Sequence, residues 1–125
     1  MADIQTFIPE VINAHFDEAA YLYSEFQTEV KAPKLDATYL KGVVARIEAN
    51  LEGLVINAEA AAEYCDAALE GDDAGEFFVA AYLAFQTGDL AKIKPLAEIA
   101  QASAPLLEAV ACGLAWHPWE LCGFW

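Results

Sequence analysis

Histidine and cysteine are the residues of this chain that could serve as bases, nucleophiles or soft metal ligands. There are two histidines and three cysteines: His15, His117, Cys65, Cys112 and Cys122. Cys112, His117 and Cys122 lie close together in sequence, but a structural zinc site needs four ligands and this run supplies three. Nothing in the sequence marks a thiol as activated for nucleophilic attack. We predict that His117 packs at a helix end and that His15 pairs with the carboxylate of Glu18.

Carboxylates offer two further kinds of site, and the sequence lacks the spacing for either. A calcium loop places oxygens around a tight glycine turn, in the pattern D-x-[DN]-x-[DN]-G, which residues 72–76 do not match. A di-iron helical bundle needs two Glu-x-x-His units, and neither histidine has a glutamate three residues before it. The sequence therefore predicts no metal, no cofactor and no catalytic residue, and we expect a protein that is not an enzyme.

Acidic residues are nevertheless concentrated in one region. Ten acids and no base lie between Arg46 and Lys92. Four of them recur at steps of four, three and four residues and so share one helix face, which we call the acidic face: Glu59, Glu63, Asp66 and Glu70. Asp72 and Asp73 follow directly, and all six are candidate partner-binding residues. Like charges at i,i+4 cost a helix about 0.2–0.5 kcal/mol per pair. The acidic face either keeps an apolar protein in solution or steers a basic partner.

The C-terminal end is rich in bulky aromatic groups. Four of them, also candidate partner-binding residues, lie within ten positions: Trp116, Trp119, Phe124 and Trp125. Monomeric proteins rarely leave such a patch exposed, and aromatic side chains are enriched at binding hot spots. This end therefore folds back on its own chain, pairs with a second copy as a homodimer, or docks on a partner.

Composition excludes several classes of function. The chain has 125 residues, of which 58% are hydrophobic, and its formal net charge is −14. Such a chain collapses, which excludes disorder, and it lacks the basic stripe that binds nucleic acid. The longest apolar run has nine residues, Phe77 to Phe85, whereas a membrane span needs about 20. Few cysteines and no basic residue before Lys31 favour a reduced cytoplasm over secretion.

Apolar residues recur with a period near 3.6 almost throughout, which predicts a single all-α domain over residues 1–125. The expected helices are 9–31, 36–55, 58–70, 76–87, 90–103 and 105–116. Pro9 suits a first helical turn, and Asp36, Asn57 and Asp89 are expected N-caps. We expect Gly71 to close the third helix in the left-handed conformation, Gly88 to end the fourth, and Pro95 to interrupt or kink the fifth.

A weak internal repeat refines this architecture. Residues 79–85 align with residues 110–116 at an offset of 31, with four of seven positions identical. Small residues at these positions let helices approach closely, and repeats of roughly 30 to 47 residues are typical of α-solenoids. The prediction is therefore antiparallel helical hairpins stacked as a short HEAT-like α-solenoid or an irregular helical bundle.

Several segments also carry a family resemblance. They are HFDEAAYL at 15–22, Ala32-Pro33, RIEANLEGL at 46–54 and LAWHPW at 114–119. These segments resemble a family of bacterial proteins of unassigned biochemical function, whose members carry HEAT-like repeats and are encoded near type VI secretion loci. The chain resembles the N-terminal module of that family without the downstream repeats, and it has Asn50 where histidine is expected.

Two functional hypotheses follow. The resemblance implies an accessory protein of type VI secretion, an adaptor or chaperone for a secreted effector, which binds through apolar contacts at its aromatic end. The acidic face suggests instead a cytoplasmic immunity protein that inhibits a basic toxin. Both are non-enzymatic protein–protein interactions, without nucleic acid or membrane.

Overall fold

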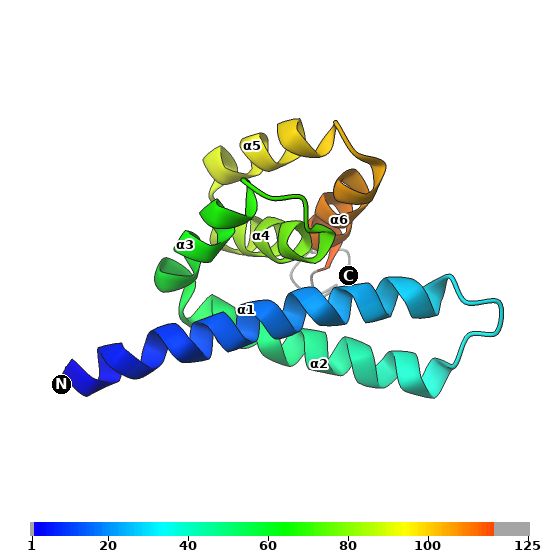
Figure 1. Ribbon diagram of the computed structural model, residues 1–125, viewed down its shortest axis with the longest axis horizontal. Helices are drawn as coiled ribbons and strands as arrows, with labels where there is room; N and C mark the ends of the chain where they lie inside the picture. The colour runs from blue at the N-terminus through cyan, green and yellow to red at the C-terminus, as the bar shows by residue number, and fades with distance from the viewer. Residues whose placement is uncertain (1, 117–125) are drawn as a thin grey trace, which may run out of the picture.

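The computed structural model describes residues 2–116, and within them the side chains of 9–89 and 91–116. This part of the chain forms helices and no strand, so the all-α prediction is confirmed (Figure 1). The helices are α1 (Ala2–Val30), α2 (Ala37–Ile56), α3 (Ala58–Ala68), α4 (Ala74–Thr87), α5 (Leu90–Ala100) and α6 (Ala104–Ala115).

The two longest helices form an antiparallel hairpin along one side of the molecule. In α1 the apolar stripe buries Ile12, Phe16 and Ala19, and in α2 the corresponding stripe buries Ile47 and Leu51. The two stripes face each other and also cover α4 (Figure 1). A period of 3.6 residues therefore explains which sides of these helices lie inside.

The helix α4 is the centre of the core, because it packs against every other helix. Its run of apolar residues buries Phe77, Phe78, Val79 and Ala81 on several sides at once. A helix that is apolar nearly all round can only be satisfied by neighbours on all sides. The longest apolar run of the sequence is thus the middle of the fold. Within the described residues no helix is both long and apolar enough to cross a bilayer.

The internal repeat corresponds to two stacked hairpins. The helix α5 begins 32 residues after α3, and α6 begins 30 residues after α4. The two repeated segments lie in α4 and α6, which pack closely side by side. Gly113 of α6 lies over the α4 backbone, and a Cβ built on it would be 2.5 Å from the carbonyl oxygen of Phe78 and 2.9 Å from the Cβ of Ala81. The glycine in the second copy of the repeat thus permits the close approach of α6 to α4.

Two of the predicted helix signals act as expected. The Asp36 side chain accepts a hydrogen bond from the backbone N–H of Tyr39 at 3.0 Å and caps α2. Gly88 has φ of 74° and ends α4 in the left-handed region, where glycine is favoured. Asn57 and Asp89 do occupy N-cap positions, but neither makes a side-chain cap hydrogen bond.

Other helix boundaries differ from the prediction. Pro9 is inside α1, which begins at Ala2, and Pro95 is inside α5 without interrupting it. Gly71 is not left-handed, because α3 ends earlier, at Ala68. The next helix starts before the predicted residue 76, since the Asp73 side chain accepts from the N–H of Glu76 and caps α4 there.

Candidate functional site

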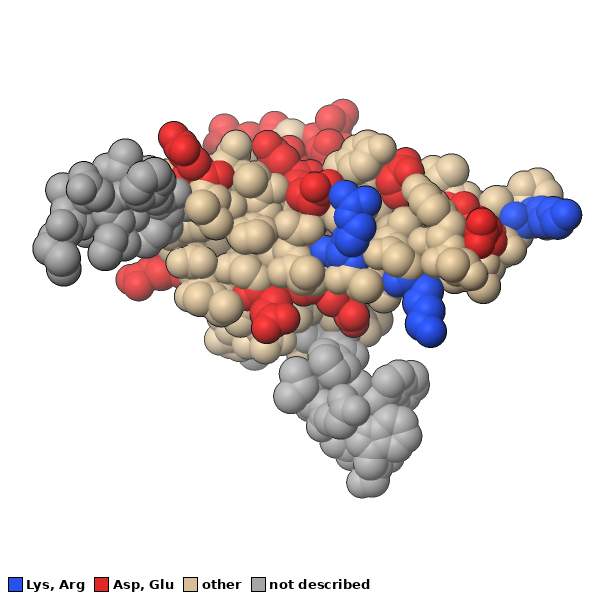
Figure 2. Space-filling model, turned by 90° about the horizontal axis from the view of Figure 1, so that it is seen from below, with Lys and Arg blue, Asp and Glu red and all other residues tan. Residues whose placement is uncertain are grey.

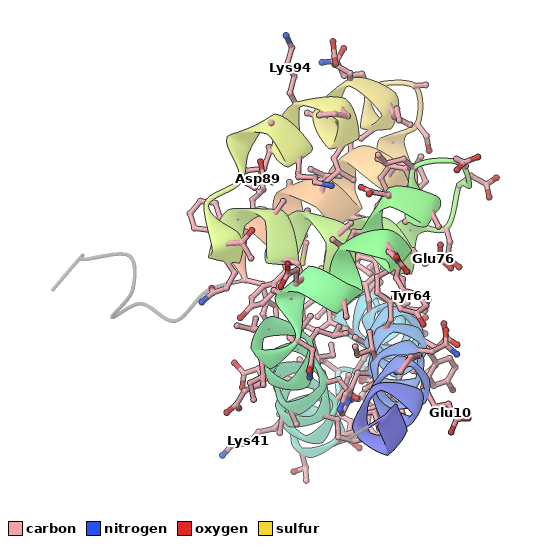
Figure 3. The ribbon with its side chains drawn as sticks, turned by 90° about the vertical axis from the view of Figure 1, so that its left-hand side faces the viewer. Glu10, Lys41, Tyr64, Glu76, Asp89 and Lys94 are labelled. Atoms are coloured by element: carbon pink, nitrogen blue, oxygen red, sulfur yellow. The ribbon has the colours of Figure 1, made fainter. Side chains whose placement is uncertain are left out.

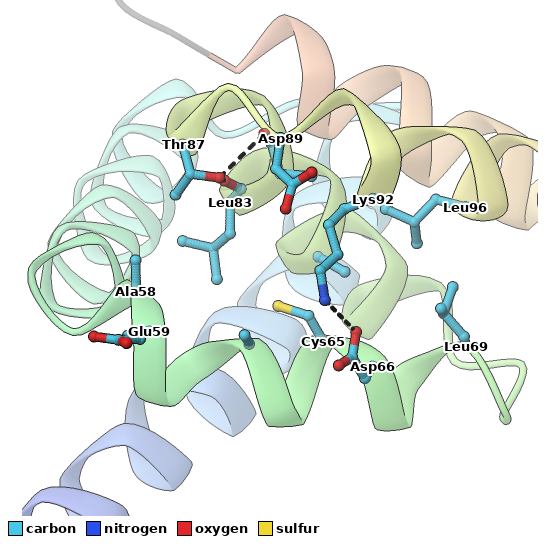
Figure 4. A pocket seen from close by; sticks show the side chains of 13 residues that line it. Ala58, Glu59, Cys65, Asp66, Leu69, Leu83, Thr87, Asp89, Lys92 and Leu96 are labelled. Atoms are coloured by element: carbon cyan, nitrogen blue, oxygen red, sulfur yellow. Dashed lines mark hydrogen bonds and ion pairs between the residues drawn. The ribbon is translucent and has the colours of Figure 1, made fainter.

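A pocket of about 230 Å³ opens between α3, α4 and α5 (Figure 4). We call it the α3–α5 pocket. It exists because the two stacked hairpins meet through α4 and α6, while α3 and α5 do not approach closely. Small residues on the facing sides, such as Ala62 and Ala84, leave the space unfilled. Its apolar walls are formed by Ala62, Leu69, Ala80, Leu83, Ala84 and Leu96.

Charged side chains are grouped among the residues that line this pocket. Lys92 of α5 reaches across to α3 and donates a hydrogen bond to Asp66 at 2.9 Å, as Figure 4 shows. The carboxylate of Asp66 raises the pKa of the Lys92 ammonium. Glu59 and Asp89 also line the pocket, so three carboxylates accompany one ammonium there. The pocket therefore combines an apolar wall with a net negative rim.

A thiol lines the same pocket and is kept neutral. Burial raises the pKa of Cys65 to about 12, because the desolvated thiolate is disfavoured. Burial also raises the pKa of Cys112, on α6, to about 11. A nucleophilic cysteine needs the opposite shift. Neither thiol therefore has the ionisation of a catalytic nucleophile.

These raised values predict a loss of stability in alkali. The unfolded chain ionises its thiols near their ordinary pKa of about 9, whereas the folded chain does not ionise Cys65 until about 12. The stabilisation is complete below about pH 9 and is lost as the pH rises toward about 12. At ~1.4 kcal/mol per pH unit, Cys65 alone should lower the free energy of unfolding by about 2–3 kcal/mol at about pH 11. Urea unfolding followed by circular dichroism measures this.

The control for this prediction is Cys65→Ala, which removes the ionisable group. Its stability should fall less steeply over the same pH range than that of the natural chain. Burial also raises the pKa of Tyr23 and Tyr82, so the variant should still lose some stability in alkali. Identical pH profiles for the two proteins would show that Cys65 is not buried in this way.

All four residues of the acidic face are exposed, but the structure divides them. Glu59, Glu63 and Asp66 lie on α3, whereas Glu70 lies in the turn that follows, because the helix ends at Ala68 and not at the predicted residue 70. Asp66 is paired with Lys92, a base that sequence reasoning did not connect to this face. Within the described residues, Glu59, Glu63 and Glu70 make no ion pair. Asp72 is exposed in the loop before α4. Asp73 is also exposed, but its side chain caps that helix by accepting a hydrogen bond from the backbone N–H of Glu76.

Near Asp73 the acidic region extends onto other helices. Partial burial, with Asp73 and Asp17 of α1 nearby, raises the pKa of Glu76. Glu76 and Tyr64 lie on the same side of the molecule in Figure 3. The Tyr64 hydroxyl on α3 donates a hydrogen bond to the backbone carbonyl of Pro9 on α1, at 3.2 Å. On the face seen in Figure 2, acidic side chains occur along both edges, and the few basic ones lie centrally or toward the α1–α2 loop.

The histidine prediction needs a correction. Among the described residues His15 makes no ion pair with Glu18, which instead accepts a hydrogen bond from Arg46 at 3.4 Å. The His15 Nδ1 lies 2.8 Å from Oδ1 of Asn50, whose own amide N–H donates to the carbonyl of Arg46. The opposite edge of the ring packs against Gly53 of α2, where a built Cβ would lie only 2.7 Å from the His15 Nε2. His15 therefore joins α1 to α2 as a packing residue.

The aromatic end is described only at its first member. Trp116 is partly buried and makes edge contacts with Phe26 and Phe78, with ring centroids 5.0 and 5.3 Å apart. For Trp116, the fold-back alternative therefore applies. The remaining predicted residues lie outside the described part of the chain: His117, Trp119, Cys122, Phe124 and Trp125.

Among the described residues, no group of three or more histidine, cysteine or acidic side chains is arranged to hold a metal ion. Comparisons of the chain with models of protein families, with curated proteins and with solved structures find no match.

Proposed function

We propose that this chain is a non-enzymatic protein-binding module that receives a basic partner on its acidic face. The observation that carries the proposal is the exposure of Glu59 and Glu63 on α3, and of Glu70 in the turn after it, without balancing cations among the described residues. Such a face costs helix stability, and a purely solubilising surface would intersperse lysines. Complementary charge raises the rate at which a basic partner associates.

The resemblance to the family encoded near type VI secretion loci suggests two settings for this binding. One is an adaptor or chaperone-like role toward a secreted effector. The other is an immunity role, in which the chain masks a basic toxin in the cytoplasm. We favour the immunity role, which uses the exposed acidic face. An adaptor that binds through Trp116 would have to compete with the contacts that this side chain makes to Phe26 and Phe78.

A charge-reversal experiment tests the proposal. The variant carries Glu63→Lys, Glu70→Lys and Asp72→Lys, which leaves Asp66–Lys92 and the pocket residues intact. Partner proteins are captured from a lysate of the source cell, and their association kinetics are then measured with the purified partner. We expect the association rate constant at low salt to fall about tenfold or more, because steering by exposed charges has this magnitude.

The matched control reverses three exposed glutamates on other helices and changes the net charge equally. These are Glu10 of α1, Glu48 of α2 and Glu98 of α5. We expect this control to change association less than threefold. Equal effects of the two variants would mean that net charge alone matters, and no effect of either would contradict the proposal. A partner that stays bound at high salt would point instead to an apolar adaptor surface, since exposed charges are screened within about 10 Å at ~0.1 M salt.

A further inference from the structure

We propose that the α3–α5 pocket is an anchor site for one apolar side chain, of leucine or phenylalanine size, that a basic partner segment carries among its lysines or arginines. This inference rests on the proposed function and specifies which feature of the partner is recognised. It differs from electrostatic steering by the acidic face, because an anchor must fill the pocket, whereas steering needs only the electric field of the exposed carboxylates.

The size and the lining of the pocket support an apolar occupant. An apolar cavity of about 150 Å³ in a protein core holds benzene, so the 230 Å³ available here accommodates a leucine or phenylalanine side chain. The walls present alanine and leucine, and the Cys65 thiol among them is neutral. Fully burying such a side chain contributes about 1.5–3 kcal/mol, which corresponds to roughly 10- to 150-fold in affinity.

The charge around the pocket selects the surroundings of that side chain. Lys92 pairs with Asp66 and also interacts electrostatically with Asp89, so one lining cation is shared by two lining carboxylates. Glu59 makes no ion pair among the described residues, and the lining therefore keeps a net negative charge. Glu63 on α3 and Glu70 in the turn after it continue the negative charge. A partner segment with lysine or arginine beside its apolar anchor complements this arrangement, whereas an acidic segment is repelled.

The test uses three fluorescent helical peptides. The first has leucine on one face and lysine elsewhere, the second has every leucine replaced by alanine, and the third has every lysine replaced by glutamate. We expect the first peptide to bind the natural chain and the other two to bind at least tenfold more weakly. Tight binding of the glutamate peptide would overturn the charge argument, and equal binding of the alanine peptide would overturn the anchor.

A filled-pocket variant and its matched control locate the binding. Ala62→Leu adds volume at a residue that lines the pocket, and Ala60→Leu adds the same volume at an exposed residue of α3 that does not. We expect Ala62→Leu to weaken the leucine peptide at least tenfold and Ala60→Leu to change it less than twofold. Equal affinities would overturn the proposal. Circular dichroism of both variants establishes that they are folded.

A second measurement keeps the proposal testable even if Ala62→Leu does not fold. Cys65 lines the pocket and Cys112 does not, so the leucine peptide should slow the reaction of N-ethylmaleimide with Cys65 while leaving Cys112 unchanged. Peptide mapping distinguishes the thiols. Absence of protection would overturn the anchor site. Tighter binding by a peptide with the sequence of residues 117–125 would overturn the basic partner in favour of another copy of this chain.

The two proposals fail separately. If the charge-reversed variant of the acidic face binds the leucine peptide weakly while Ala62→Leu binds it normally, the anchor is wrong and the acidic face stands. If Ala62→Leu abolishes binding and charge reversal has no effect, the pocket is a binding site and the basic-partner function is wrong.

Discussion

Replacing Gly75 by alanine should destabilise the fold by about 3 kcal/mol or more, although alanine is the better helix former. Gly75 lies in the first turn of α4, where that helix crosses α1. A Cβ built on it would lie 2.8 Å from the carbonyl carbon and 2.9 Å from the Cα of Ala20, and closer still to the Ala20 carbonyl oxygen. Overpacking costs about 1–3 kcal/mol when side chains can adjust, and here the obstacle is backbone that cannot rotate away.

The consequence spreads beyond the contact itself. To admit the methyl group, α1 and α4 must separate, which loosens the packing between two helices that both contribute to the core. A domain of this size has a total stability of about 5–15 kcal/mol, so the loss is a large share of it. Urea unfolding of Gly75→Ala, followed by far-ultraviolet circular dichroism, gives the change in the free energy of unfolding.

The same substitution at Gly42 is the matched control. Gly42 is exposed within α2, and no other part of the molecule lies within 4 Å of a Cβ built on it. With no obstacle, the higher helix propensity of alanine should stabilise the protein by up to about 1 kcal/mol. The two changes should therefore have opposite signs. A neutral or stabilising effect of Gly75→Ala would contradict the close crossing of α1 and α4.

These glycines show what local sequence patterns can and cannot predict. The fold class follows from periodicity, because each apolar stripe needs a neighbour and its spacing reveals the helix. The cap at Asp36 also follows, since it depends on residues only three positions apart. Gly71 and Gly75 look alike in sequence, yet neither takes a left-handed turn. The role of Gly75 depends on Ala20, which is far away in the chain.

The candidate site was predictable only in part for the same reason. Four carboxylates on one helix face can be read from their spacing. The ion pair of Lys92 with Asp66 joins residues 26 positions apart, and the pairing of His15 with Asn50 spans 35. The α3–α5 pocket depends on how two hairpins stack, and its signal in the sequence is indirect: the 31-residue repeat together with small residues at positions such as 62 and 84.

Truncating Phe78 to alanine should cost about 3–5 kcal/mol, the largest effect of a side-chain deletion that we expect in this chain. Phe78 is fully buried in α4. Its ring stacks on Tyr23 of α1, with centroids 4.7 Å apart, and meets the edge of Trp116 after α6 at 5.3 Å. Its loss therefore removes contacts to two other parts of the core at once.

The control for Phe78→Ala is Tyr21→Ala, which truncates an aromatic residue of α1 that is 58% exposed. Surface truncations of this kind usually change stability by about 0.5 kcal/mol or less. Phe78→Leu, which keeps most of the apolar volume, should cost about 1.5 kcal/mol or less if the core repacks. Equal losses for Phe78→Ala and Tyr21→Ala in urea unfolding would contradict the central place of Phe78.

A double-mutant cycle between Phe78→Ala and Trp116→Ala connects this core to the question of partner binding. Aromatic pairs contribute about 0.5–1.5 kcal/mol beyond the area that they bury, so we expect a coupling energy in that range. Such a coupling means that the core holds Trp116 and that a partner must break this contact to use it. A coupling near zero would mean that the contact with Phe78 does not hold Trp116 in the core, which would weaken the argument against the adaptor role.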